Sequence, residues 1–186
     1  MEQNIYYPLP SDYAELSLEG QKQARLAVLC NQATPNDLVT AWRFFRRIYL
    51  GGVGRLFYKN GFCESPQFHA DLVYDLGSHG RNCMAAPRGS AKSTVIGIEV
   101  PLLLALTRPH YEMSLGLATD KLVEERFDKL IQQFTQNELI LQDFGEIRPP
   151  RGRSIWNHHY LSLNNGAIIK GLSVMGKKRG GRPRLF

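Results

Sequence analysis

The stretch CMAAPRGSAKSTVIGIEV, residues 83–100, constrains the fold more than any other part of the chain. Residues 81–86, RNCMAA, form a short apolar run that is typical of a buried strand, and the final AKSTVIGIEV predicts a helix. Small and polar residues, 87–91, make a turn between them. A strand that passes through a short turn into a helix is the unit from which parallel sheets are built. We therefore expect an α/β fold.

The same stretch approximates the pattern G-x-x-x-x-G-K-[ST] of phosphate-binding loops, with Ala86 and Ala91 in place of the two glycines. Such a loop needs backbone N–H groups around an anion, a helix N-terminus behind them, a lysine, and a hydroxyl for Mg²⁺. Lys92 and Ser93 hold the last two positions, and Gly89 supplies conformational freedom. An alanine forced into a left-handed conformation costs about 1 kcal/mol or more. We expect a nucleotide site; the alternative is a plain strand-to-helix turn with a surface lysine.

Composition is that of an ordinary globular protein, with 43% hydrophobic and 22% charged residues in a chain of 186. The most apolar stretch, residues 95–106, contains Glu99 and Pro101 and is too short to span a bilayer. The N-terminus lacks the pattern of a signal peptide, and the cysteines lack paired or metal-ligand spacing. We expect no membrane association and reduced thiols in a cytosol.

The net charge of +6 is unevenly distributed along the chain. After Glu146 there are nine basic residues and no acidic one, whereas the preceding part carries 14 basic against 17 acidic residues. A basic end of this kind indicates a polyanionic partner, either nucleic acid or nucleotide phosphate. The alternative is that these charges face acidic groups on another segment or subunit.

Residues 1–60 are expected to form a helical appendage. A first helix is indicated within residues 11–30, and a second begins at Thr34, which suits a cap, followed by Pro35 at the first helical position. The second helix has an apolar face and ends at two glycines; that face comprises Leu38, Trp42, Phe45 and Tyr49. Three arginines off this face are expected on the solvated surface: Arg43, Arg46 and Arg47.

Residues 61–186 alternate between strand and helix patterns. We expect a strand at 112–119 and one helix over 120–145, with Asp120 as its cap and Gly145 at its end. The apolar face of that helix is predicted to comprise Leu122, Phe127, Leu130, Ile131 and Phe134. A hairpin follows, with its turn at residues 164–166, Asn-Asn-Gly. These elements predict a parallel sheet covered on both faces.

His158 and His159 are adjacent in the predicted hairpin. Because neighbouring side chains of a strand point to opposite faces, we do not expect the two histidines to share a metal ion.

Five segments in this order resemble the large terminase subunits of tailed bacteriophages and related viruses, the ATP-driven motors that package DNA into capsids. The resemblance covers residues 62–186 and lies in the order and spacing of PQFHADLVYDL, APRGSAKST, LGLATDKLVEERFDKLIQQF, DFGEIRPPRGRSIWNHHYLSLNNGAIIKGLSV and KKRGGRPRLF.

The resemblance implies that residues 61–186 are a partial ATPase domain of the P-loop type, with a parallel sheet flanked by helices and incomplete at its C-terminus. ATP and Mg²⁺ are the implied cofactors. Lys92 would bind the β/γ-phosphates and Arg88 would stabilise the γ-phosphate, so these two are the implied catalytic residues. Ser93 would hold Mg²⁺. The remaining implied cofactor-binding residues are Gly89, Ser90, Ala91, Thr94 and, as an adenine contact, Gln67; for Gln67 an ordinary loop residue is the alternative.

The resemblance also implies partners: double-stranded DNA, a terminase small subunit, the portal of a capsid, and further copies of the chain in a ring, all in the host cytoplasm. In the family, RPRLF leads into a strand that carries the Walker B Asp and the catalytic Glu, and this sequence ends at Phe186. Asp143 and Asp120 do not replace them, because the first continues a helical pattern and the second suits a helix cap.

We therefore expect the chain to bind nucleotide no more than weakly, and we expect hydrolysis of the nucleotide to require a longer protein. A fragment of a helicase-type P-loop ATPase and a non-catalytic remnant that binds nucleotide or DNA remain alternatives.

Overall fold

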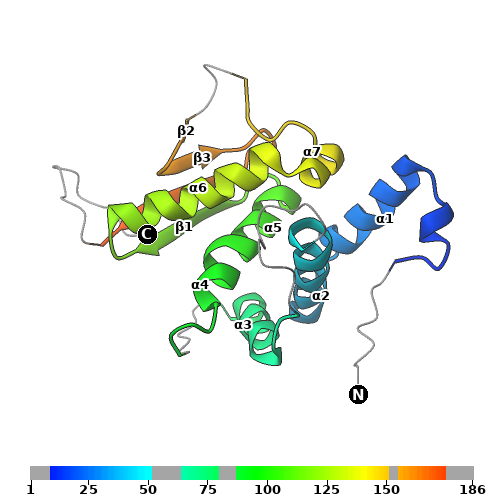
Figure 1. The fold of residues 1–186 in the computed structure, drawn as a ribbon, viewed down its shortest axis with the longest axis horizontal. Coiled ribbons are helices and arrows are strands. Elements are labelled where there is room, and N and C mark those ends of the chain that lie inside the picture. The colour runs from blue at the N-terminus through cyan, green and yellow to red at the C-terminus, as the bar shows by residue number, and fades with distance from the viewer. Residues whose placement is uncertain (1–8, 52–63, 80–86, 151–154, 175–186) are drawn as a thin grey trace.

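The computed structural model describes residues 9–51, 64–79, 87–150 and 155–174. It is an α/β structure, in which helices pack together with one four-stranded sheet (Figure 1). In chain order the elements are a 3₁₀ turn η1 (Tyr13–Glu15), α1 (Leu18–Cys30), α2 (Pro35–Phe45), a π-helical turn η2 (Arg46–Leu50), α3 (Gln67–Ser78), α4 (Lys92–Thr94), a second π-helical turn η3 (Val95–Glu99), α5 (Val100–Thr107), β1 (Glu112–Leu117), α6 (Asp120–Gln136), α7 (Glu138–Phe144), β2 (Trp156–Asn157), β3 (Tyr160–Ser162) and β4 (Ile168–Ser173).

The sheet is mixed, with the strand order β1-β4-β3-β2. β1 pairs in parallel with β4, while β3 pairs antiparallel with both β4 and β2. The prediction of a parallel sheet is thus wrong for the described strands except at β1 and β4. The physical reason is the predicted turn at residues 164–166, where Gly166 has φ 84° and returns the chain beside β3. The strand predicted at 81–86 lies outside the described residues.

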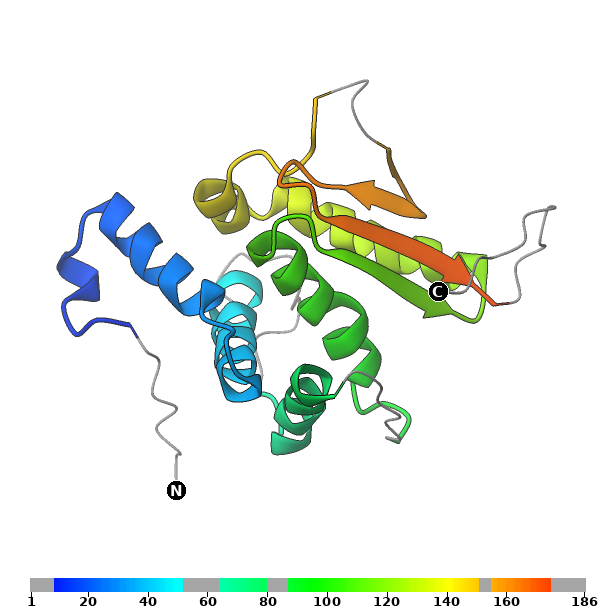
Figure 2. The same cartoon turned by 180° about the vertical axis from the view of Figure 1, so that it is seen from behind.

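One face of the sheet is covered by α6, which lies along the strands and is seen behind them in Figure 2. The approach is close at Gly171 of β4, since a Cβ there would lie 2.4 Å from the side chain of Val123 on α6. Val123 and Phe127 are fully buried in this contact. The glycine at position 171 therefore leaves the room that α6 needs to pack this closely on the sheet.

The helix predicted over 120–145 is broken at Asn137 into α6 and α7. The Asn137 side chain accepts a hydrogen bond from the Ile140 N–H and donates one to the Tyr49 carbonyl. It therefore caps α7 and fixes it to η2 at the same time. Gly145 ends α7 as predicted, with φ 73° and its N–H bonded to the Leu141 carbonyl.

Two details of the α6 prediction are wrong. Thr119, not Asp120, caps the helix, because its side chain accepts from the Leu122 N–H. Leu122 itself is 41% exposed, and Val123 takes its place in the buried face. A shift of one residue separates the two assignments, and the packing of α6 on the sheet selects the face that includes Val123.

The α2 prediction is confirmed. Thr34 and Asp37 form a reciprocal capping box, and Pro35 occupies the first helical position. All four residues of the predicted apolar face are buried: Leu38, Trp42, Phe45 and Tyr49. Arg46 is the exception to the predicted surface arginines, because it is buried at 8% exposure and pairs with Glu99.

One continuous hydrophobic core contains residues from both sides of the boundary that the sequence predicted at residue 60. α2 packs on α3 and α5, and α1 also contacts α5, so the N-terminal helices share their buried face with the rest of the molecule (Figure 1). Among the described residues no helix has the length and apolar character needed to cross a membrane.

His158 and His159 lie in a two-residue turn between β2 and β3 rather than in a strand. Both face acidic residues of α6, with His158 Nδ1 2.8 Å from Asp128 and His159 Nε2 3.9 Å from Glu124. Within the described ranges, no group of three His, Cys, Asp or Glu side chains is arranged to hold a metal ion.

Candidate functional site

The turn before α4 has a strained backbone. Gly89 has φ 78° and Ala91 has φ 54°, so both residues are left-handed. Glycine adopts this conformation without penalty, whereas alanine adopts it at an energetic cost. The cost expected from the sequence therefore falls on Ala91, the position of the second glycine in the phosphate-loop pattern. The position of the first glycine, Ala86, lies outside the described residues.

The loop closes on the carbonyl of Pro87. Lys92 Nζ donates to this oxygen over 3.2 Å, and Ser90 Oγ donates to it over 2.8 Å. The lysine side chain thus lies back across the loop that precedes its own helix. The two hydrogen bonds join Ser90 and Lys92 to the start of the loop, and the Lys92 ammonium is the charged group among these contacts.

A histidine of α3 fixes the loop from outside. His69 Nε2 lies 2.6 Å from the Ser90 carbonyl oxygen, and His69 Nδ1 lies 3.1 Å from Ser65 Oγ. His69 is buried, at 5% exposure. His69 is not among the site residues predicted from the sequence. The one feature of the sequence that could have indicated it is its place in the segment PQFHADLVYDL.

Three consecutive backbone N–H groups of the loop, those of Gly89, Ser90 and Ala91, make no hydrogen bond within the part of the chain that the structure describes. The Ala91 carbonyl, by contrast, accepts from both the Thr94 and the Val95 N–H and so begins the helix. α4, η3 and α5 follow without a break, so the loop stands at the positive end of one helical segment. Unbonded amides next to left-handed residues are the arrangement that binds anions.

A pocket of about 410 Å³ adjoins the loop. It lies between the start of the helical segment and the carboxyl half of β1, and its lining includes Lys92, Ser93 and Leu117. Ligands of α/β proteins bind at the carboxyl ends of parallel strands, which is where this pocket lies. The other lining residues are Leu72, Leu76, Ile96, Gly97, Ser114, Leu115, Gly116 and Arg126.

Arg126 brings a second positive charge to this pocket from α6. The aliphatic part of its side chain lies close to Gly97. Its Cδ is 3.7 Å from the position that a Cβ at Gly97 would take. Burial lowers the pKa of the Arg126 guanidinium, which remains charged at neutral pH. Arg126 makes no hydrogen bond or ion pair within the described ranges. No feature of the sequence indicated this role, since VEERF has the composition of a solvated helix face.

The remaining predicted site residues are divided by the structure. Ser93 is exposed at the pocket and Thr94 follows it in α4, while Arg88 is exposed in the turn. Gln67, the first residue of α3, does not line the pocket. Its amide is held by neighbours, with Oε1 accepting from Arg43 over 2.8 Å and Nε2 donating to an aspartate of α3.

Neither aspartate weighed as a substitute acid lines this pocket. Asp143 is buried in α7 and paired with Arg25. Asp120 opens α6 and accepts a hydrogen bond from Ser173. No acidic residue lines the pocket beside Lys92 among the described residues.

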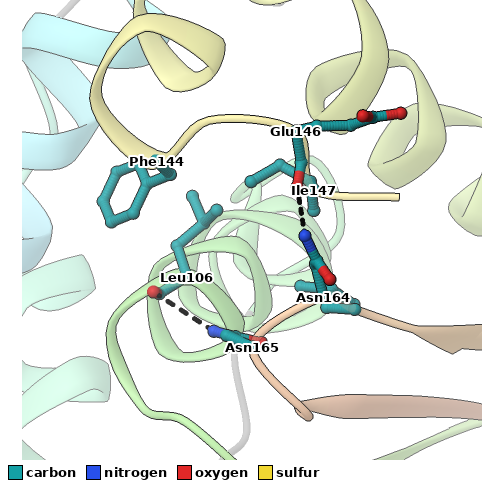
Figure 3. A pocket seen from close by; sticks show the side chains of 7 residues that line it. Leu106, Phe144, Glu146, Ile147, Asn164 and Asn165 are labelled. Carbon is teal, nitrogen blue, oxygen red and sulfur yellow. Dashed lines mark hydrogen bonds between the residues drawn. The ribbon is translucent and has the colours of Figure 1, made fainter. Parts of the chain in front are cut away.

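A second pocket, of about 290 Å³, lies between the end of α5, the end of α7 and the hairpin turn (Figure 3). Its amide groups are already bonded: Asn164 Nδ2 donates to the Glu146 carbonyl and Asn165 Nδ2 to those of Ala105 and Leu106. With its amides occupied and Glu146 its one charged lining residue, it offers no site for an anion. The loop and the pocket at Lys92 therefore form the candidate site.

Comparison of the chain with protein-family models, with curated proteins and with solved structures found no match in any of the three.

Proposed function

We propose that residues 87–94 bind the phosphates of ATP together with Mg²⁺. The observation that carries this proposal is the backbone of the loop: left-handed residues at 89 and 91, with unbonded amides at 89–91, directly before Lys92 and Ser93. A strained backbone is retained where a ligand uses it, and amides open to solvent can donate to that ligand. A plain strand-to-helix turn does not need a left-handed alanine.

Each residue has a definite task under this proposal. Lys92 Nζ exchanges the Pro87 carbonyl for the β- and γ-phosphate oxygens, which accept a stronger, charge-assisted hydrogen bond. The Ser93 hydroxyl is placed to coordinate Mg²⁺, and bound Mg²⁺ supplies charge neutralisation to the phosphates. Arg88 in the turn and Arg126 across the pocket add positive charge on two sides.

The wider proposal is that this chain contributes the nucleotide-binding part of a terminase large subunit, which uses ATP to package double-stranded DNA. Its support is the order of five sequence segments together with an α/β structure that contains a strand, helix and hairpin in the expected succession. ATP hydrolysis, the ring of subunits, the small subunit and the portal belong to this wider proposal.

Nucleotide binding by the purified 186-residue chain tests the first proposal. We expect a fluorescent ATP analogue to bind in the presence of Mg²⁺ and Lys92→Ala to weaken binding about 10- to 100-fold, because a charge-assisted hydrogen bond is lost. Lys129→Ala is the matched control, since Lys129 is exposed on α6 and does not line the pocket. Equal affinities for the two variants, or no binding by the native chain, would refute the proposal.

DNA binding tests the wider proposal. Of the nine basic residues after Glu146, Lys170 pairs with Glu112 and Arg148 lies over the ring of Trp156. The other seven lie outside the described residues. We expect the chain to bind double-stranded DNA with an affinity that falls steeply between 50 and 200 mM salt, as phosphate neutralisation requires. Absence of DNA binding at low salt would leave a nucleotide-binding remnant as the better interpretation.

A further inference from the structure

We propose that His69 is the positioning residue of the loop: by donating from Nε2 to the Ser90 carbonyl it aims the Ala91 N–H at the bound phosphate. The inference rests on the proposed function and extends it to a residue of α3 that is remote in sequence from the loop.

The chemistry of the contact fixes the state of the ring. A carbonyl oxygen only accepts hydrogen bonds, so the nitrogen 2.6 Å from Ser90 O must carry the proton. In the neutral ring Nδ1 is then the acceptor and takes the hydroxyl proton of Ser65, 3.1 Å away. His69 is therefore the Nε2–H tautomer; the Ser90 carbonyl selects it, and the Ser65 hydroxyl adapts to it as a donor.

The peptide bond carries this constraint into the loop. The C=O and N–H of a trans peptide point in opposite directions, so holding the Ser90 oxygen toward His69 turns the Ala91 N–H away from α3. That N–H makes no hydrogen bond in the described part of the chain. Without the contact to His69, the Ser90–Ala91 peptide is free to rotate, which would relieve the left-handed strain at Ala91.

The surroundings make His69 a rigid support. The residue is 5% exposed, and its ring lies 4.2 Å from that of Phe68, centroid to centroid. α3 itself is packed against α2, and a Cβ at Gly77 would lie 3.2 Å from the side chain of Leu38 on α2. The loop thus takes its orientation from the helical core rather than from its own short sequence.

The test compares two substitutions of equal length. In His69→Gln the amide nitrogen stands where Nε2 stood and donates to Ser90, whereas His69→Met fills the same space without a donor. We expect His69→Met to weaken binding of the Mg²⁺ complex of the fluorescent ATP analogue about 3- to 10-fold, the worth of one hydrogen bond. We expect His69→Gln to bind within about 2-fold of the native chain.

The outcomes separate this inference from the function on which it rests. If Lys92→Ala loses binding while His69→Met binds as the native chain does, the inference is wrong and the proposed function stands. Equal losses in His69→Gln and His69→Met would also overturn it, because the donor would then not matter. A native chain that binds no nucleotide overturns the proposed function itself.

A measurement on the native chain covers the case in which a variant does not fold. Nitrogen NMR of the labelled imidazole reports which ring nitrogen carries the proton. The Nε2–H tautomer is expected for His69 with and without nucleotide; the Nδ1–H tautomer cannot donate to Ser90 and would overturn the inference.

Discussion

The loop at residues 87–94 and the buried cluster of Arg25, Tyr49 and Asp143 differ in how their polar groups are hydrogen-bonded. In the cluster, Arg25 donates from Nε and Nη2 to the two oxygens of Asp143, over 2.7 and 2.6 Å, and the Tyr49 hydroxyl donates to the same carboxylate over 2.5 Å. In the loop, three consecutive amides are unbonded within the described residues. The cluster is closed to water and the loop is exposed.

Under the proposed function, the difference separates anchoring from ligand binding. A buried charge without partners is too costly to keep, so the cluster is complete and joins three segments that are far apart in sequence: α1, η2 and α7. An exposed loop can leave donors to water until a ligand takes them. We expect substitutions in the cluster to change stability and substitutions in the loop to change binding.

A second buried cluster links the two regions. Glu99, at the end of η3, accepts from Trp42 Nε1 over 2.8 Å and pairs with Arg46 Nε at 3.4 Å. It lies on the same helical segment as Lys92, so the middle of that segment is fixed to α2 and η2. Both partners of this ion pair stand in π-helical turns, which are frequent at functional sites.

The largest effect is expected for Asp143→Ala. It leaves the Arg25 guanidinium buried without its partner, which costs about 3–5 kcal/mol of unfolding free energy. Urea denaturation measures this, with Asp128→Ala as the control, because Asp128 pairs with His158 at the surface and should cost less than about 1 kcal/mol. A loss in Asp143→Ala no larger than in the control would break the contrast between cluster and loop.

Tyr49→Phe should have an intermediate effect that depends on pH. Burial and the hydrogen bond to Asp143 raise the pKa of the Tyr49 hydroxyl well above its ordinary value of 10.0. A raised pKa contributes stability that is present below the unfolded value and lost as pH rises.

The native chain should therefore exceed Tyr49→Phe in unfolding free energy by about 1.5–3 kcal/mol at neutral pH. This excess should shrink above about pH 10, as the tyrosine ionises in the unfolded chain only. Urea denaturation of both proteins from pH 7 to 11 measures it. An excess that stays constant with pH would show that Tyr49 titrates alike in the folded and unfolded states.

The smallest effects are expected for a reciprocal pair in the loop. A Cβ added at Gly89 would meet nothing within 4 Å, so Gly89→Ala tests conformation alone and should cost about 1 kcal/mol. Ala91→Gly should stabilise by about 0.5–1 kcal/mol, because it relieves the left-handed alanine. Thermal unfolding of both variants measures these changes. Changes of the same sign in the two variants would contradict the assignment of strain to both positions.

Local signals in the sequence predicted much of the fold correctly. The capping box at Thr34 and Asp37, the Asn-Asn-Gly turn before β4 and the cap at Gly145 each depend on a few neighbouring residues. The turn into α4 was also predicted from neighbouring residues, whereas the left-handed conformation of Ala91 is shown by the structure. Such features need no partner from elsewhere in the chain.

The errors concern residues whose surroundings come from distant segments. Arg46 has the sequence context of a surface arginine, yet Glu99 of another helix makes its burial possible. Asn137 breaks a continuous helical pattern because Tyr49, 88 positions away, takes its amide. In each case a tertiary contact outweighs a local preference that is worth less than about 1 kcal/mol.

What the sequence by itself determined is thus most of the local elements and the place of the loop between its flanking elements, with Lys92 and Ser93 at its end. Only the tertiary structure decided that His69 contacts this loop, that Arg126 shares its pocket, and that β4 lies between β1 and β3 in the sheet. The physical reason is the distance along the chain over which each kind of interaction acts. Caps, turns and left-handed residues depend on the chain within a few positions, whereas a hydrogen bond from another helix has no trace in the sequence until the chain has folded.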